Sequence, residues 1–207
     1  MKSLNTFGNS LISNCRHQQF KIVETLEALL TRNSVTSLSE PIPTQEEMEV
    51  VFQAALRAPD HAWLRPWKFI QVTGEGRKKL GDAFVQTATA VNEELPEALV
   101  EKAKNAPFRA PMVLVLIADI KEHPKVPEIE QILSTGAAAQ NMLLAIHDLG
   151  YAGVWRTGSM AFNSEITKYM ELPEKNRVIG YLYVGTPNGR IKEIPSLDTK
   201  EFVTYWK

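Results

Sequence analysis

The sequence is poor in cysteine and has no long hydrophobic segment. Cys15 is the single cysteine among 207 residues, so no disulfide can form within the chain, as is typical of a reducing compartment. Cys15 also stands in a polar segment without a matched base, which disfavours it as a nucleophile. No stretch approaches the ~20 apolar residues of a membrane-spanning helix, and residues 1–17 lack a signal-peptide pattern. We therefore expect a cytoplasmic protein with no membrane partner.

The sequence also lacks a strong charge and the common motifs for metals and nucleotides. Its net charge is −1 and it contains no basic run, so we expect no nucleic-acid partner. A phosphate-binding loop, a His-Glu-x-x-His pair and a Cys-x-x-Cys pair are all absent. His123 and His147 have no second ligand at metal spacing, which excludes a recognisable metal site. Gly74 and Gly76 lack the third glycine of a dinucleotide-binding fingerprint.

What is present is a series of amphipathic helices and apolar strands. Apolar residues at helical spacing predict helices over residues 20–31, 44–57, 77–91, 130–149 and 163–170. Apolar runs predict strands over residues 67–72, 111–118, 151–156 and 177–185, and residues 92–105 are expected as an exposed helix or lid. Strands and helices without regular alternation predict an α+β fold, with a mixed central β-sheet flanked by helices. Residues 1–19 are expected to be an N-terminal extension, and residues 20–207 one domain.

The turn between residues 57 and 67 is the segment around which the rest is organised. A helix ends near Arg57, and His61 and Arg65 precede the strand that opens at Pro66–Trp67. An arginine at a helix end commonly interacts with the helix dipole, and a histidine in a turn commonly faces solvent. Cationic and aromatic groups between a helix end and a strand start also suit a flat, anionic, aromatic ligand.

Two further segments carry cationic side chains in turns. Arg32, Asn33 and Ser34 follow the first predicted helix. They are either a solvated helix end or a phosphate clamp, in which a guanidinium and a hydroxyl bind the anion. The second segment, residues 153–158, leads from a strand into a turn bounded by glycines and reads Gly-Val-Trp-Arg-Thr-Gly. By itself that pattern is commonplace.

Taken together, these three motifs resemble the flavin-dependent nitroreductase family. The turn that closes on Arg65-Pro66-Trp67-Lys68-Phe69 is similar to that family's Gln-Pro-Trp-x-Phe turn. An Ala-Pro-Asp-His sequence before it is similar to the short, single-domain branch of NAD(P)H nitroreductases. The resemblance extends from about Ile22 to Val184. The chain departs from the pattern at Thr36, Trp63, Arg65 and Thr157, where the family commonly has a cation, an asparagine, a glutamine and a serine.

The resemblance implies a nitroreductase-like homodimer with two FMN molecules at its interface, each held by both chains. It implies that the residues that bind FMN are Arg32, Asn33, Ser34, Arg57, His61, Trp155, Arg156 and Thr157. The arginines would contact the phosphate or the ring edge, and Trp155 would cover the ring. A stretch that some relatives use for NAD(P) corresponds to Ala145, Ile146, His147, Asp148, Leu149 and Gly150. The aromatic C-terminal tail would pack on the partner subunit.

The implied activity is that of an FMN-dependent NAD(P)H oxidoreductase. NAD(P)H would reduce the flavin and leave, and a nitroaromatic or quinone acceptor would then take the electrons, in a ping-pong sequence. The flavin carries the chemistry, so no side chain is expected to be catalytic. An FMN-binding protein of the same fold, with another redox substrate or little reductase activity, is the alternative.

Overall fold

The computed structural model of the protein describes residues 25–92 and 94–207. The predicted N-terminal extension, Cys15 and the first residues of the helix predicted over residues 20–31 therefore lie outside the described residues. The remainder of that helix is α2 (Thr25–Thr31).

Five strands form the central sheet: β1 (Leu38–Ser39), β2 (Trp67–Thr73), β3 (Met112–Asp119), β4 (Ala152–Arg156) and β5 (Asn176–Pro187). The long strand β5 pairs with β3, which in turn pairs with β2, and β5 also pairs with β4 and β1. All four of these pairings are antiparallel. The sheet that the sequence predicts is thus mainly antiparallel among the described residues. The parallel component is a single bridge between Ser34 and Gly153.

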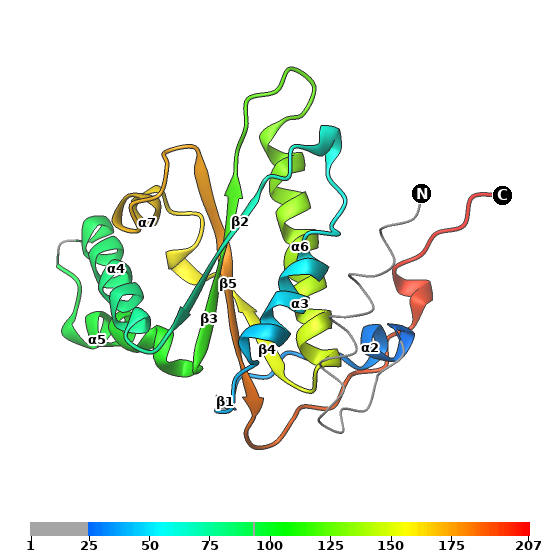
Figure 1. The fold of residues 1–207 in the computed structure, drawn as a ribbon, viewed down its shortest axis with the longest axis horizontal. Helices are drawn as coiled ribbons and strands as arrows, with labels where there is room; N and C mark the ends of the chain where they lie inside the picture. Colours follow the sequence, from blue (N-terminus) through cyan, green and yellow to red (C-terminus); the bar gives the residue numbers. More distant parts are fainter. Residues whose placement is uncertain (1–24, 93) are drawn as a thin grey trace.

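Helices cover both faces of the sheet (Figure 1). One face carries α3 (Gln45–Ala55) and the long helix α6 (Glu128–Asp148). The other carries α4 (Gly76–Val91), α7 (Ser164–Tyr169) and α5 (Glu97–Asn105), which packs on α4. Residues 112–118 of β3 are all buried, since both faces of that strand are covered. This two-sided burial is why the sequence shows a continuous apolar run there.

A bulge in β5 lies where β4 approaches it. The register of the β3–β5 pair shifts between Leu116 and Ile117, and Gly180 adopts a φ of +147°. The indole of Trp155 lies against Gly180 and its Nε1 donates to the Ile179 carbonyl at 3.3 Å. Glycine is required because a Cβ at position 180 would lie 2.0 Å from that indole nitrogen.

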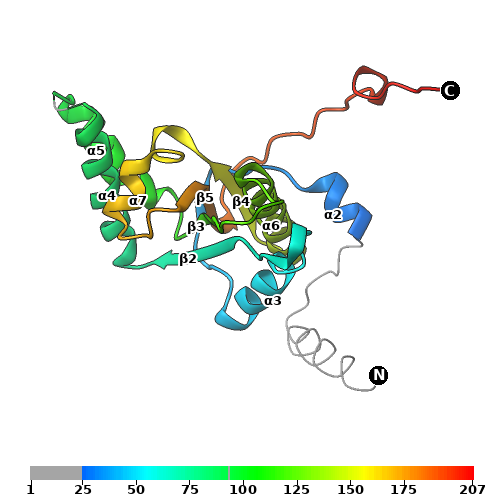
Figure 2. The same ribbon diagram turned by 90° about the horizontal axis from the view of Figure 1, so that it is seen from above.

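The C-terminal segment leaves the body of the molecule after β5 (Figure 2). It contains one short helix, η5 (Thr199–Glu201), and most of its side chains are exposed. Trp206 is 96% exposed, and Phe202 and Tyr205 are also largely exposed. The described part of the chain thus leaves this aromatic tail without a covering surface. Within residues 25–92 and 94–207, no helix has the length and apolar content to cross a membrane.

Candidate functional site

The segment Arg32–Ser34 lies along the outer edge of β4. The backbone of the next residue, Val35, donates to the Gly153 carbonyl at 3.2 Å. The Asn33 side chain accepts from the Ser34 amide at 2.8 Å and donates to the Lys192 carbonyl at 2.6 Å. Asn33 therefore connects this segment to the C-terminal tail. Arg32 is half-buried and Ser34 is exposed, so both can reach a ligand at this edge.

Arg57 and His61 lie in the turn that follows α3, and both are exposed. The Asp60 carboxylate accepts from the Arg65 amide at 2.8 Å, which closes the turn. Ala62, Trp63 and Arg65 all have positive φ values, between 48° and 57°. Non-glycine residues adopt this conformation at a cost of about 1–3 kcal/mol each, and such strain concentrates at functional sites. His61 Nδ1 lies 2.8 Å from the Glu130 carboxylate in the first turn of α6.

These two cationic segments lie at opposite ends of α6. His61 contacts Glu130 near the beginning of the helix, whereas Thr31, beside Arg32, lies 3.0 Å from His147 Nε2 near its end. Glu130 and His147 are 17 residues apart, so with a rise of 1.5 Å per residue the segments are about 25 Å apart. The chain by itself therefore does not bring Arg32 and His61 into one site. Arg57 lies nearer the middle of α6, because Asn141 of that helix donates to the carbonyl of Ala54, three residues before Arg57, at 3.0 Å.

The third segment divides its side chains between the two faces of the sheet. Trp155 packs toward α6 near Gly136, and its indole nitrogen is occupied by the Ile179 carbonyl. Arg156 points to the opposite face, where its guanidinium lies 5.7 Å from the centre of the Tyr183 ring. Thr157, at the end of the strand, is exposed, and Gly158 follows with a φ of +58°. Of the three predicted contacts, Thr157 and the adjacent backbone are the most accessible.

The stretch from Ala145 to Gly150 forms the last turn of α6 and its cap. Ile146 is fully buried, and Ala145 and Leu149 pack against the core. Gly150, with a φ of +85°, ends the helix. The side chains of His147 and Asp148 are half-buried. The use of this stretch for NAD(P) stays a prediction.

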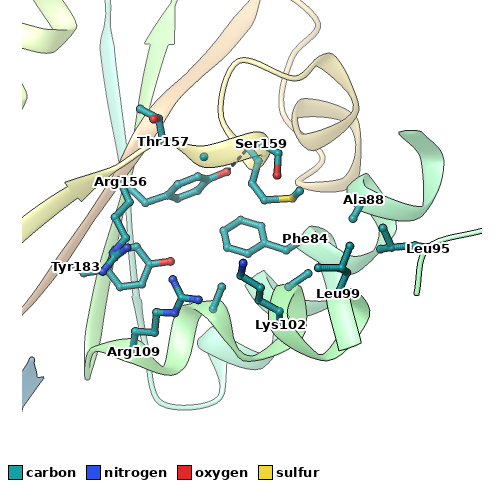
Figure 3. A pocket seen from close by; sticks show the side chains of 15 residues that line it. Phe84, Ala88, Leu95, Leu99, Lys102, Arg109, Arg156, Thr157, Ser159 and Tyr183 are labelled. Atoms are coloured by element: carbon teal, nitrogen blue, oxygen red, sulfur yellow. Dashed lines mark hydrogen bonds between the residues drawn. The ribbon is translucent and has the colours of Figure 1, made fainter. Parts of the chain in front are cut away.

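A cavity of about 450 Å³ opens beside the third segment, between α4, α5 and the sheet (Figure 3). Its wall includes Arg156 and Thr157 together with η4 (Gly158–Met160) and η3 (Ala106–Arg109). Two further cationic side chains, Lys102 and Arg109, also line it. Sequence reasoning did not single these two out, because the Lys- and Glu-rich region around α5 is typical of a solvated helix. The fold itself places them beside Arg156.

Comparisons with known proteins identify the family of this chain. A family model described as "Nitroreductase family" matches residues 29–186. The chain belongs to the nitroreductase family. It is 36% identical over 187 residues to "Putative NAD(P)H nitroreductase YdjA" of Escherichia coli strain K12, covering 89% of this chain and all of that protein. A Haemophilus influenzae protein named "Putative NAD(P)H nitroreductase" is 37% identical, covering 88% of this chain and all of the relative.

Solved structures share the nitroreductase fold. A nitroreductase-like protein from Bacillus cereus superposes with a TM-score of 0.75 at 22% identity, covering 89% of this chain and 97% of that one. The NADPH:FMN oxidoreductase of Vibrio harveyi, complexed with NAD⁺, superposes with a TM-score of 0.67 at 22% identity, covering 87% and 76%. The predicted family and fold are thereby confirmed, and the protein is an oxidoreductase of the nitroreductase family. The role of each residue at the site stays a prediction.

Proposed function

We propose that this nitroreductase is an FMN-dependent NAD(P)H oxidoreductase that reduces nitroaromatic or quinone acceptors and acts as a homodimer. Family membership and the names of its relatives support an NAD(P)H oxidoreductase. The observation that carries the proposal further is the separation of the two cationic turns along α6. They can serve one cofactor only if a second copy of the chain completes the site.

The side chains present suit FMN. Arg32 and Arg57 offer guanidinium groups that can bind a phosphate with two hydrogen bonds, and Ser34 offers a hydroxyl beside Arg32. At Arg156 the Nε atom is buried and has no hydrogen-bond partner within the described residues. Buried polar atoms are usually paired, so an acceptor near this guanidinium would remove an unfavourable feature of the free chain.

A twofold axis near the middle of α6 would bring the separated turns together. Packed antiparallel on its mate, each α6 places its beginning beside the end of the other. The solvent-facing side of α6 is suited to this, since Ile129 and Leu133 are 58% and 65% exposed. On α2, Leu26 and Leu30 are exposed above 70%, and the aromatic tail lies uncovered nearby. Exposed apolar surface of this kind is typical of an interface.

In the proposed dimer, each site combines two sets of residues. Arg32 and Ser34 bind the phosphate end, Thr157 and its backbone orient the ring edge, and Arg57 of the partner subunit and His61 of the partner subunit close the site. When bound, FMN supplies the redox chemistry, accepting a hydride from NAD(P)H and passing electrons to the acceptor. The protein residues hold the cofactor, orient it and offset its negative charge. None of them needs to act as a nucleophile or a general base.

The test is whether the purified protein carries FMN and whether Arg32 holds it. We expect the spectrum of oxidised flavin, and we expect Arg32→Met to weaken FMN binding about ten- to a hundredfold through loss of a charge-assisted contact. FMN affinity can be measured by flavin fluorescence after dialysis. Lys168→Met, on the surface of α7, is the matched control for loss of one positive charge.

Unchanged FMN affinity in Arg32→Met would overturn the phosphate role of that side chain. Oxidation of NADH and NADPH, with and without nitrofurazone or menadione, then tests the reductase activity. A protein that holds FMN but oxidises neither nucleotide would instead be the flavin-binding alternative.

A further inference from the structure

We propose that the cavity between α4, α5 and the β4–η4 turn binds the acceptor of the proposed reaction and selects acceptors with an apolar ring and an anionic group, such as aromatic carboxylates. The part that concerns the acceptor rests on the proposed function. The binding of an organic anion rests on the cavity alone.

Positive charge converges at one end of this cavity. Lys102 from α5 and Arg109 from η3 point toward the Tyr183 hydroxyl, and the Arg156 guanidinium from β4 lies against the Tyr183 ring, 5.7 Å from its centre (Figure 3). None of the described residues that line the cavity is an aspartate or a glutamate. Among the described residues, no ion pair involves any of these three cations. A carboxylate at this end would meet several donors of one sign.

The other end of the cavity is apolar and partly aromatic. Phe84 and Tyr181 meet edge to face, with ring centres 5.0 Å apart. Leu99 and Met160 complete that wall. A ring packed here would bury apolar surface, while its anionic substituent would reach the cationic end. The volume of about 450 Å³ falls within the range of small-molecule sites, ~300–1,000 Å³.

The cavity also lies next to the segment predicted to contact the flavin. Thr157 and Gly158 belong both to its wall and to the turn that the family resemblance assigns to FMN. A ligand in the cavity would therefore lie beside the proposed cofactor, as an electron acceptor must. Tyr183 can donate a hydrogen bond there as a neutral phenol, because burial raises its pKa against the opposing effect of Arg109 and Arg156.

The experiment compares 4-nitrobenzoate with its neutral methyl ester, methyl 4-nitrobenzoate, as ligands of the full-length purified protein. Direct binding is followed by ligand-observed NMR, and KM is measured for each compound with NADPH or NADH. We expect tighter binding and a lower KM for the acid. The double variant Lys102→Met/Arg109→Met should weaken binding of the acid about ten- to a hundredfold, leave the ester nearly unchanged and keep the FMN content.

The control is Lys104→Met, which removes one positive charge from the same helix outside the cavity wall. An equal effect of Lys104→Met, or equal weakening of acid and ester, would overturn the anion site. So would loss of FMN in the double variant, since these cations would then belong to the cofactor. A protein without FMN would refute the proposed function, whereas NMR binding of the acid would still decide whether the cavity holds an anion.

Discussion

At the scale of single residues, Trp155 and Arg156 show how one strand serves two different environments. Neighbouring residues of a strand point to opposite faces of the sheet. Trp155 consequently packs near α6 and against Gly180, while Arg156 reaches the cavity lined by Tyr183. The family resemblance predicted that both residues contact the flavin. The structure gives the indole a packing role that the sequence pattern alone did not indicate.

That packing role leads to a prediction for Gly180. In Gly180→Ala the new methyl group would overlap the Trp155 indole and the residue would keep a φ of +147°. We expect the free energy of unfolding to fall by about 2–5 kcal/mol, measured by urea denaturation. Gly189→Ala is the control, because φ there is +105° but nothing lies within 4 Å of the added Cβ. Equal losses in both variants would attribute the cost to φ and not to the indole.

At the scale of helices and strands, local patterns predicted most of the fold. The Thr44–Glu47 capping box is present, with the Glu47 amide donating to the Thr44 hydroxyl at 3.2 Å. The apolar run predicted as a strand over residues 111–118 is β3, and the helix predicted over residues 130–149 is α6. The antiparallel order of the sheet, in contrast, depends on pairing between distant segments, which periodicity does not encode. The two-residue strand β1 (Leu38–Ser39) was missed, since it is too short to show a pattern.

For the candidate site, too, local motifs identified individual residues, whereas their positions in space depended on the packing of distant segments. Arg32, Arg57 and Arg156 were each found from local motifs. That the Arg32 segment and His61 lie about 25 Å apart along α6 could not be predicted, because it depends on which end of the helix each segment contacts. The position of Lys102 and Arg109 in the cavity wall could not be predicted either, because it depends on how α5 and η3 pack beside β4.

The junction between α3 and α6 gives a prediction at this scale. The Tyr151 hydroxyl, just after α6, donates to the Glu47 carboxylate at the start of α3 at 3.1 Å. Burial, with the nearby Glu47 charge, raises the pKa of Tyr151 to about 12. Between pH 10, the usual tyrosine pKa, and pH 12, the folded state holds a proton that the unfolded state has lost. Stability should therefore be complete below pH 10 and decrease as pH rises to 12.

We expect Tyr151→Phe to reduce the slope with which the free energy of unfolding decreases between pH 10 and pH 12. The reduction should be a fraction of the ~1.4 kcal/mol per pH unit that one titrating group can contribute. Urea denaturation at a series of pH values would measure the slope. Tyr205→Phe, in the exposed tail, is the control. An unchanged slope in Tyr151→Phe would mean that the contact with Glu47 does not couple folding to pH.

At the scale of the whole molecule, large apolar side chains are exposed to solvent on α2, on α6 and in the C-terminal tail. The elements that carry these exposed side chains, namely α2, α6 and the tail, lie on the side of the molecule away from α4 and α5 (Figure 1). The two cationic turns flank the same helix, α6. A dimer through α6 would cover this surface and complete the cofactor site at once.

We therefore expect Leu133→Asp, on the exposed side of α6, to convert the proposed dimer to monomer and to release FMN together. Burying a charge in the interface, with loss of a leucine contact, should cost about 2–4 kcal/mol of association energy. Light scattering coupled to size-exclusion chromatography, with absorbance at the flavin band, reports both properties. Val91→Asp, at the exposed end of α4, is the control. A monomer that keeps its flavin would show that one chain suffices.

The separation of the two turns along α6 also has a practical consequence for handling the enzyme. If every complete site needs two chains, the fraction of working sites falls on dilution even when free FMN is plentiful. Specific activity would then rise with enzyme concentration. An assay at very low enzyme concentration would give a lower specific activity than the concentrated stock solution has.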